Sequence, residues 1–465
     1  MIKTSHFAKV QSEAGILRVL IPNNIRSELH GKEYMWSKSL VSYMEQGMIE
    51  NSGRITNRML NKLLHRDLEF EKIKMRTMTD RIEETGMAYL QAQSTRAETI
   101  LQEYGWDTKS LLPLQDTDLK PYGAGKGNDV STTTKLPDEE QEGFVKELIR
   151  EINAKREPEA QIPDDASNIW DIEPSDSSAV YISLDAVGSK RQKDNRPKNS
   201  DGNAPVFFQD ENDGPVDYTR APDPKKRPKV ETAVAHIQVD DKKYLFAAQN
   251  MFLVCKLVLA FLLEKGLLQS RSLVFFSDGG KDIRKCIDDI FSFCPHTVVL
   301  DWFHLKKHCL ELLSMTLYGG KENRPMQYEV RRRLFHILWA GNTDGAINFL
   351  NTLGSDKVRN PKKLQELIDY LKNNAARNVI ACYALRRKLG LRVSSNPVEK
   401  ANDLIVASRQ KGDSMSWSRS GSWGLAAITC MYLNHEADYF HIHHKVQPEM
   451  YTDYGIIFDL EKAAA

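Results

Sequence analysis

The chain has 465 residues, of which 41% are hydrophobic and 27% are charged. Its 64 lysine and arginine residues nearly balance 63 aspartate and glutamate residues, so the formal net charge is +1 and does not by itself indicate a nucleic-acid partner. The length excludes a single small binding domain. Because no run approaches the roughly 18 apolar residues of a membrane span and the start lacks the order of a signal peptide, we expect a soluble, non-exported protein without a membrane partner.

The first expected module is helical. From about residue 34 to 104, apolar residues recur at three-to-four spacing, which predicts amphipathic helices. We therefore expect a helical N-terminal domain over 1–105. A helix-turn-helix that binds DNA is one interpretation of it, and helices that only pack together are the other. A polar stretch that includes one charged, helix-like segment follows over 106–176 and is predicted to be a linker.

The composition changes at residue 177, where an α/β core is expected. The stretch 179–188 is a short strand of β-branched and aromatic residues, followed by a long polar insertion over 189–229. Two strands then meet at a tight turn at Asp240 and Asp241. The order β, β, β, α, β, α, β predicts a mixed α/β core, followed by a run that is helical almost throughout. The later elements are expected at 251–266 (helix), 272–280 (strand), 281–291 (helix), 296–305 (strand) and 303–390 (helices).

Three of these strands end in an aspartate, namely Asp185, Asp278 and Asp301. Open α/β sheets bind their ligands at the carboxyl ends of the strands. Two carboxylates on neighbouring strands repel each other, and a hard divalent cation such as magnesium or manganese relieves that repulsion. Each aspartate also has an ordinary explanation as a turn or cap residue. Asp278 in particular would cap the helix that begins at Lys281.

Glu399 is the fourth candidate carboxylate. Asn396 as a cap and Pro397 as the first helical residue predict a helix start, which places Glu399 in the first turn. The helix dipole favours an acid there and is a sufficient structural reason for it. Its surroundings indicate a function, because carboxylates, two metal ions and neighbouring basic side chains are what in-line phosphodiester chemistry requires.

The segment around Glu399 is strongly basic. Between residues 377 and 411 it holds eight basic residues against two acids, Glu399 and Asp403. This segregation favours a phosphate-binding face, and a merely solvated surface explains it equally well. The basic residues are Arg377, Arg386, Arg387, Lys388, Arg392, Lys400, Arg409 and Lys411.

Other motifs carry weaker signals. His304 and His308 have the spacing of two zinc ligands on one helical face, but the sequence indicates no third ligand. The HIHH run at 441–444 is interpreted as a surface cluster. The GAGKG run at 123–127 lacks the spacing and context of a phosphate-binding loop. Six cysteines without a CxxC pair argue against disulfides and thiolate zinc sites.

Taken in order, these motifs resemble the transposases of bacterial insertion sequences in the Mutator-like group, particularly its ISKra-type and ISLre-type branches. The resemblance covers about residues 179–430, and the order of the motifs is more specific than any single one. The motifs are LDAV (184–187), SDGGKDI (277–283), VLDWFHLKKH (299–308), LWAGNTDGAINFL (338–350), the stretch 390–399 and RQKGDSMSWSRSGSWGLAAI (409–428).

The resemblance implies an α/β RNase H-like core over 177–305 and 394–465, with an all-α insertion domain over 306–393. It also implies a DDE-type acidic triad that binds two Mg²⁺ ions, with Mn²⁺ as a substitute. Carried over by position, the triad is Asp185, Asp278 and Glu399, with intervals of 278 − 185 = 93 and 399 − 278 = 121 residues. The helical run at 303–390 fits within the second interval.

The implied activity is that of a DNA transposase, which cleaves transposon ends and transfers the strands. Its partners would be double-stranded DNA, the terminal inverted repeats and target DNA. It would act as a homodimer or larger homo-oligomer in the bacterial cytoplasm, associated with the nucleoid. Two alternatives are a domesticated, catalytically inactive DNA-binding relative and a structure-selective nuclease with the same fold.

Further residues are expected to support the triad or to contact DNA. Asp301 and His304 match a family position after the next strand, and Asp301 is also the rival of Asp278 for the second metal position. Trp417 and Trp423 stand about 600° apart along a helix, so they either pack separately or one stacks on an unpaired base at the transposon end. The basic residues expected in these roles are Arg386, Arg387, Lys388, Arg392, Lys400, Arg409, Lys411 and Arg419.

Overall fold

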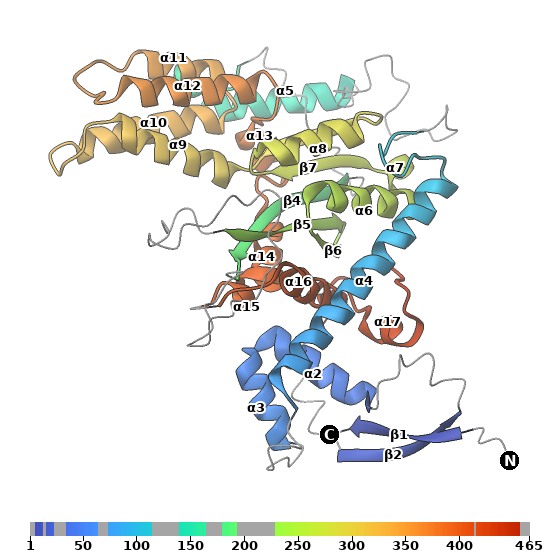
Figure 1. Cartoon of the computed structure of the whole chain (residues 1–465). Helices are drawn as coiled ribbons and strands as arrows, with labels where there is room; N and C mark the ends of the chain where they lie inside the picture. The colour runs from blue at the N-terminus through green and yellow to red at the C-terminus, as the bar shows by residue number, and fades with distance from the viewer. Residues whose placement is uncertain are drawn as a thin grey trace.

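The protein is an α/β structure built on a mixed five-stranded sheet with strand order β6-β5-β4-β7-β8 (Figure 1). The strands are β4 (Ala179–Lys190), β5 (Lys229–Val239), β6 (Lys242–Ala248), β7 (Ser272–Ser277) and β8 (His296–Leu300). The computed structural model describes residues 5–12, 15–22, 34–63, 73–113, 139–163, 179–192, 228–412 and 415–455.

The sheet combines an antiparallel meander with two parallel strands. Strands β4, β5 and β6 pair antiparallel, and the predicted turn at Asp240 is present, with a left-handed φ of 55°. Strand β7 pairs parallel to β4, and β8 pairs parallel to β7. Each parallel strand is reached through helix, first α6 (Met251–Glu264) and α7 (Leu267–Ser270), then α8 (Lys281–Phe291). The predicted order of strands and helices in the core is therefore confirmed.

One face of the sheet is covered by α6, α8 and the end of the long helix α4 (Met75–Glu103). Helix α6 is mostly apolar and is buried from Val254 to Leu263, because the sheet lies on one side of it and α4 on the other. Ile182 of β4 and Phe275 of β7 are fully buried under these helices. This layer supports β4 and β7, the strands that lead to the candidate aspartates.

The opposite face is covered in two parts. Between β8 and the last core helices the chain is helical, and these helices cover β7 and β8. They are α9 (Trp302–Thr316), α10 (Arg324–Trp339), α11 (Thr343–Asn351), α12 (Pro361–Ala375) and α13 (Tyr383–Lys388). The second part covers β4, β5 and β6. It consists of α14 (Asn396–Asn402), the π-helical turn η4 (Asp403–Ala407), α15 (Ser408–Gln410) and α16 (Arg419–Leu433), and α17 (Ala437–His443) follows.

The N-terminal region is not purely helical, which corrects the expectation for 1–105. It begins with a three-stranded sheet of order β2-β1-β3, because runs such as GILRVLIP are rich in β-branched residues, which favour a strand. The strands are β1 (Ser5–Ser12), β2 (Gly15–Pro22) and β3 (Tyr34–Trp36). Helices α2 (Lys38–Glu50), α3 (Gly53–Leu63) and α4 follow and share an apolar cluster with α16 and α17.

The range 106–176, which is predicted to be a linker, contains two helices among its described residues. Helix α5 (Glu139–Asn153) and the short helix η1 (Pro158–Ala160) lie against the helical region, where Val145 and Ile149 share a buried cluster with Leu385 of α13. The GAGKG run, residues 114–138 and 164–176 of the expected linker, and most of the expected insertion after β4 lie outside the described residues. Within the described ranges, no helix combines the length and the apolar character needed to cross a membrane.

Candidate functional site

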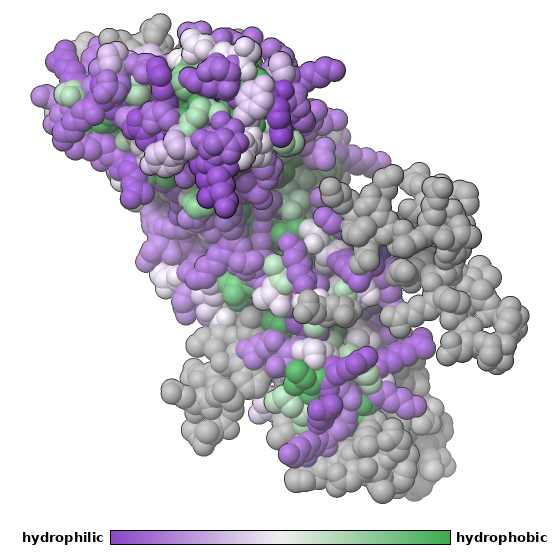
Figure 2. Space-filling view, turned by 90° about the vertical axis from the view of Figure 1, so that its left-hand side faces the viewer, coloured by the Kyte–Doolittle hydropathy of each residue, from purple (hydrophilic) through white to green (hydrophobic). Residues whose placement is uncertain are grey.

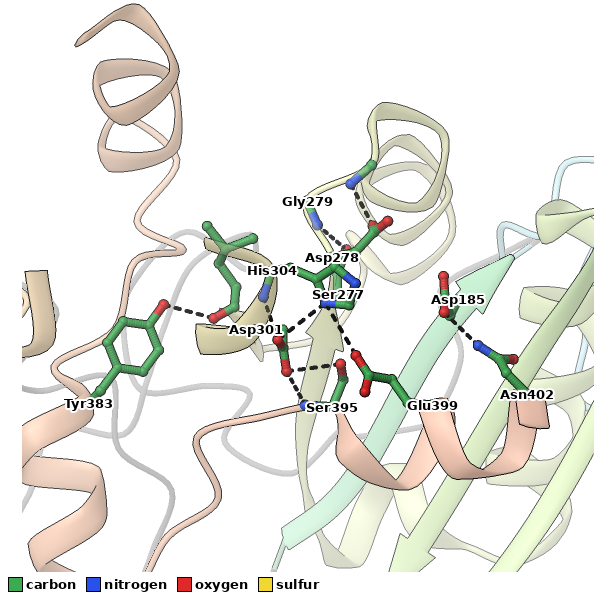
Figure 3. Close-up of polar contacts among 12 residues, drawn as sticks. Asp185, Ser277, Asp278, Gly279, Asp301, His304, Tyr383, Ser395, Glu399 and Asn402 are labelled. Carbon is green, nitrogen blue, oxygen red and sulfur yellow. Dashed lines mark hydrogen bonds and ion pairs between the residues drawn. The ribbon is translucent and has the colours of Figure 1, made fainter. Parts of the chain in front are cut away.

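Asp185 and Asp278 lie on adjacent parallel strands. Ser183 of β4 pairs with Phe276 of β7, and the same offset two residues further on reaches Asp185 and Asp278. Asp278 directly follows β7, as predicted, whereas Asp185 lies in the middle of β4, because the pairing with β5 continues to Lys190 after the pairing with β7 has ended (Figure 3). Long-range pairing thus joins two acids that are 93 residues apart in the sequence.

Asp185 is a largely buried carboxylate. Its Oδ1 accepts a hydrogen bond of 2.7 Å from the backbone N–H of Ala186, and its Oδ2 accepts one from Nδ2 of Asn402. Burial raises the pKa of Asp185, and the nearby charge of Asp278 raises it further, although the hydrogen bonds and His304 oppose the shift. Ionisation of Asp185 is therefore less favourable than that of an ordinary aspartate.

Asp278 is positioned by a tight turn. Its Oδ1 accepts a hydrogen bond of 2.7 Å from the N–H of Gly280. Gly279 has a φ of 85°, in the left-handed region, and a Cβ atom there would lie 2.9 Å from Cδ1 of Leu300. The N-cap of α8 is Gly280, without a side-chain cap hydrogen bond, so Asp278 holds the turn rather than capping α8 in the usual way.

Glu399 extends from the first turn of α14, as the sequence predicts, but the cap differs. The N-cap is Ser395, and Asn396 is already helical. Val398 and Ala401 on the same helix are buried against the sheet, which fixes α14 in place. Oε1 of Glu399 lies 3.8 Å from Nδ1 of His304, so this carboxylate faces α9 in the present arrangement (Figure 3).

Asp301 is fully buried, and its hydrogen bonds occupy both of its oxygens. Oδ1 accepts hydrogen bonds of 2.8 Å from the backbone N–H of His304 and 3.2 Å from its Nδ1, while Oδ2 accepts from both the N–H and the hydroxyl of Ser395. Burial raises the pKa of Asp301, but these hydrogen bonds together bring it below its ordinary value. Asp301 caps α9 and joins it to the start of α14, so it is not a rival metal ligand.

The side chain of His304 lies between the buried Asp301 and the exposed acids. The hydrogen bond to Asp301 raises the pKa of His304, partial burial opposes the shift, and the charges of Asp301, Asp278 and Glu399 add to it. The cationic form of His304 is therefore more favourable than that of an ordinary histidine. The ring of its neighbour His308 lies 4.3 Å from that of Tyr370, which fits packing better than the zinc site considered for this pair.

The fit of the site to a divalent cation is incomplete. Among the described residues, no group of three or more His, Cys, Asp or Glu side chains is arranged to hold a metal ion. Asp185 and Asp278 supply hard oxygen atoms from adjacent strands, which suit one Mg²⁺ or Mn²⁺ ion. Glu399 faces His304 instead of completing a triad. The residues thus fit one ion through the two aspartates, without a preassembled three-carboxylate site for two ions.

Two residues of the expected basic face are buried in the structure. Arg386 is fully buried and donates a hydrogen bond of 2.8 Å from Nε to the carbonyl of Arg392. Arg409 is 6% exposed and donates one of 2.7 Å to the carbonyl of Met48 in α2. A DNA contact by either residue is therefore wrong for this arrangement, because each guanidinium is used to join elements in the interior.

The remaining basic residues differ in their exposure. Arg392 donates a hydrogen bond of 2.6 Å to Oε1 of Gln238 and lies over the ring of Tyr181. Lys388 forms an ion pair of 3.4 Å with Glu151 of α5. The exposed residues of the set are Arg387, Lys388, Lys400, Lys411 and Arg419. A basic surface near Glu399 is thus smaller than the count of charges in the sequence indicates.

Both tryptophans use their indole N–H groups inside the protein. Nε1 of Trp417 donates a hydrogen bond of 3.1 Å to the carbonyl of Gln410, and Nε1 of Trp423 donates one of 2.8 Å to the carbonyl of Glu231. The guanidinium of Arg409 lies over the Trp417 ring at 5.1 Å from its centroid. Both rings pack against the cluster shared with α4 and α16, so the geometry favours packing over base stacking.

Two residues of the site were not singled out by the sequence analysis. Ser395 donates two hydrogen bonds to Asp301, and Asn402 donates one to Asp185. The signal for Asn402 is its position three residues after Glu399, which places it on the same helical face. Ser395 carries no comparable signal, since its role depends on the approach of α9 to α14.

The chain was also compared with known proteins. No protein-family model matches it, and no curated protein matches it either.

Proposed function

We propose that the chain is a DNA transposase of the Mutator-like group that cleaves transposon ends and transfers the strands. The observation that carries the proposal is the placement of Asp185 and Asp278 on adjacent parallel strands, with Glu399 extending from α14 beside them. Two acids from separate chain segments thus lie in register on neighbouring strands, and the carboxyl ends of such strands are where α/β proteins bind their ligands.

We further propose that the core is RNase H-like. The five-stranded mixed sheet, with its meander followed by two parallel strands, is compatible with such a core. The helices α9 to α13 occupy the interval between the second aspartate and Glu399, where the resemblance implies an insertion domain. The hydrogen bond from Asn402, which follows this interval, to Asp185 supports the proposal.

The chemistry follows from the charges of the site. Asp185 and Asp278 would hold a divalent ion, which would supply Lewis-acid stabilisation of the charge that develops on the phosphate during phosphodiester cleavage. Asp301 orients His304, and His304 in turn contacts Glu399. The exposed Lys400, next to Glu399, and Lys411 would contact backbone phosphates.

A more suitable aromatic residue for DNA lies on α9. The side chain of Phe303 is 61% exposed and directly precedes His304. Lys306 and Lys307, three and four residues further on, lie on the same side of the helix and are exposed. Figure 2 shows that the surface of the upper part of the molecule, which contains helices α9 to α13 (Figure 1), is mostly hydrophilic. An exposed ring between lysines and the acidic site suits stacking on a base at a DNA end, a role that Trp417 and Trp423 do not fit.

The test is cleavage and strand transfer on DNA that carries the terminal inverted repeats flanking the gene, with Mg²⁺ as the ion. Asp185→Ala, Asp278→Ala and Glu399→Gln are expected to abolish both reactions. Asp369→Asn, which changes an exposed acid of α12, is the matched control and is expected to keep them. Wild-type activity in all three site variants would reject the proposal.

A second candidate is a relative that binds DNA without cutting it. The contact of Glu399 with His304 favours this candidate, because the third carboxylate is not gathered with the other two. It predicts salt-sensitive DNA binding that depends on Lys400 and Lys411 but no metal-dependent cleavage of any substrate. Cleavage without joining in the same assay would instead indicate a nuclease.

A further inference from the structure

The two polar atoms of the Asn402 amide differ in their hydrogen bonding: Nδ2 has a partner, and Oδ1 has none among the described residues. Its side chain is 6% exposed, and Nδ2 donates a hydrogen bond to Oδ2 of Asp185 (Figure 3). Oδ1 of the same amide is buried and has no hydrogen-bond partner among the described residues. A buried carbonyl oxygen without a donor is unfavourable, so the position of this amide requires an explanation.

The surrounding backbone gives an independent indication that this position is special. Asn402 ends α14, and the π-helical turn η4 begins at the next residue, Asp403. Single π-turns inside helices occur often at functional sites. The helix also brings Asn402 and Glu399, three residues apart, to the same side of α14 and toward the ends of the strands.

We propose that Asn402 supplies an oxygen ligand to a divalent cation held by Asp185. This inference rests on the cation site of the proposed function. Without a cation, the amide N–H₂ group faces the carboxylate and shields its charge. A half-turn of the amide exchanges Nδ2 and Oδ1, because this terminal torsion is broad and roughly two-fold. Two oxygens then face each other, which is unfavourable unless a cation or a proton lies between them.

A purely structural role of Asn402 explains fewer of these observations than a ligand role does. A donor that only orients Asp185 accounts for Nδ2 but leaves Oδ1 buried without a purpose. The backbone N–H of Ala186 already holds the other oxygen of Asp185. An amide ligand would also supply the oxygen that the site lacks, since Glu399 faces His304.

The experiment measures metal affinity of the full chain without DNA, by electron paramagnetic resonance titration with Mn²⁺. We expect Mn²⁺ binding that is lost in Asp185→Ala and Asp278→Ala. Asn402→Ala is expected to weaken it by about 10-fold or more, the range typical of residues that tune a metal site. Thermal unfolding of each variant checks that it folds.

Asn402→Cys tests whether the side chain reaches the ion. A thiolate prefers soft metals, so this variant should bind Mn²⁺ more weakly and Cd²⁺ more tightly than the wild type. Ala401→Cys, at the neighbouring position that faces the sheet core, is the matched control and should gain no Cd²⁺ affinity beyond that of the native cysteines.

The outcomes separate this inference from the proposed function. Mn²⁺ binding that depends on both aspartates but is unchanged in Asn402→Ala overturns the inference and leaves the proposed function standing. Weaker Mn²⁺ binding in Asn402→Ala without a gain of Cd²⁺ affinity in Asn402→Cys also overturns it, because the amide then only orients Asp185. If the wild type binds no Mn²⁺ through the aspartates, the proposed function itself is wrong.

Discussion

Glu399 of α14 and His304 of α9 face each other, with Oε1 of the acid 3.8 Å from Nδ1 of the imidazole. Because His304 is itself held by the buried Asp301, the contact draws Glu399 toward α9 and away from a shared site with Asp185 and Asp278. Glu399 would therefore have to give up its contact with His304 in order to bind a cation.

Replacement of His304 by alanine is expected to release Glu399 and tighten Mn²⁺ binding. An ion pair of this exposure is worth up to ~1 kcal/mol, so the dissociation constant should fall by roughly 2- to 5-fold. Titration with Mn²⁺ measures the effect, and His308→Ala, one turn further along α9, serves as the control. Weaker or unchanged binding in His304→Ala would contradict this view of the contact.

Glu436 is expected to make stability depend on pH. Its carboxylate accepts hydrogen bonds from Tyr89 of α4 and Tyr244 of β6, near Arg96, Glu264 and Cys430. Burial raises the pKa of Glu436 from 4.5 to about 7, although the tyrosine hydrogen bonds and Arg96 lower it. Because the folded pKa lies above the unfolded one, the protonated acid stabilises the fold at low pH. Up to roughly 3 kcal/mol should be lost as the pH rises from about 4.5 to 7.

Urea unfolding between pH 5 and 8 checks this prediction. In Glu436→Gln the side chain stays neutral, so the fall in unfolding free energy over this pH range should largely disappear. Glu449→Gln, which changes an exposed partner of Lys265, should behave like the wild type. An equal pH dependence in wild type and Glu436→Gln would show that another group is responsible.

Gly86 is required for the crossing of α4 and α16. A Cβ atom at Gly86 would overlap the backbone of Gly424, although alanine is the better helix former by about 1 kcal/mol. We expect the overlap to dominate, so that Gly86→Ala destabilises the protein by about 1–3 kcal/mol. Gly143→Ala in α5, where a Cβ atom has open space, should instead stabilise slightly. Chemical denaturation compares the two, and a gain in stability for both would refute the close crossing.

The exposed lysines beside Glu399 are expected to set the salt dependence of DNA binding. Each phosphate contact contributes about 0.9 to the slope of log K against log salt, so Lys400→Ala with Lys411→Ala should reduce its magnitude by about 1.8. Affinities at several salt concentrations give the slope. Arg332→Ala on α10, whose arginine is paired with Glu329, is the control. An unchanged slope in the double variant would place the DNA elsewhere.

The sequence by itself determined the elements of the core and the positions of its acids. Alternating and β-branched runs predict β4 to β8 because local backbone preference and burial agree along each strand. Asp278 could be assigned to a strand end for the same reason, whereas Asp185 lies within β4, which continues to Lys190 through its pairing with β5. Pro397 and the turn at Asp240 are likewise local signals that the structure retains.

Only the tertiary structure decided which charged and polar groups are used inside the protein. Arg386 and Arg409 look like surface residues in the sequence but are buried, because their partners, the carbonyls of Arg392 and Met48, are brought to them by packing. The roles of Asp301 and Asn402 depend in the same way on contacts across 94 and 217 residues. Burial and hydrogen-bond partners are set by such long-range contacts, which local sequence patterns do not encode.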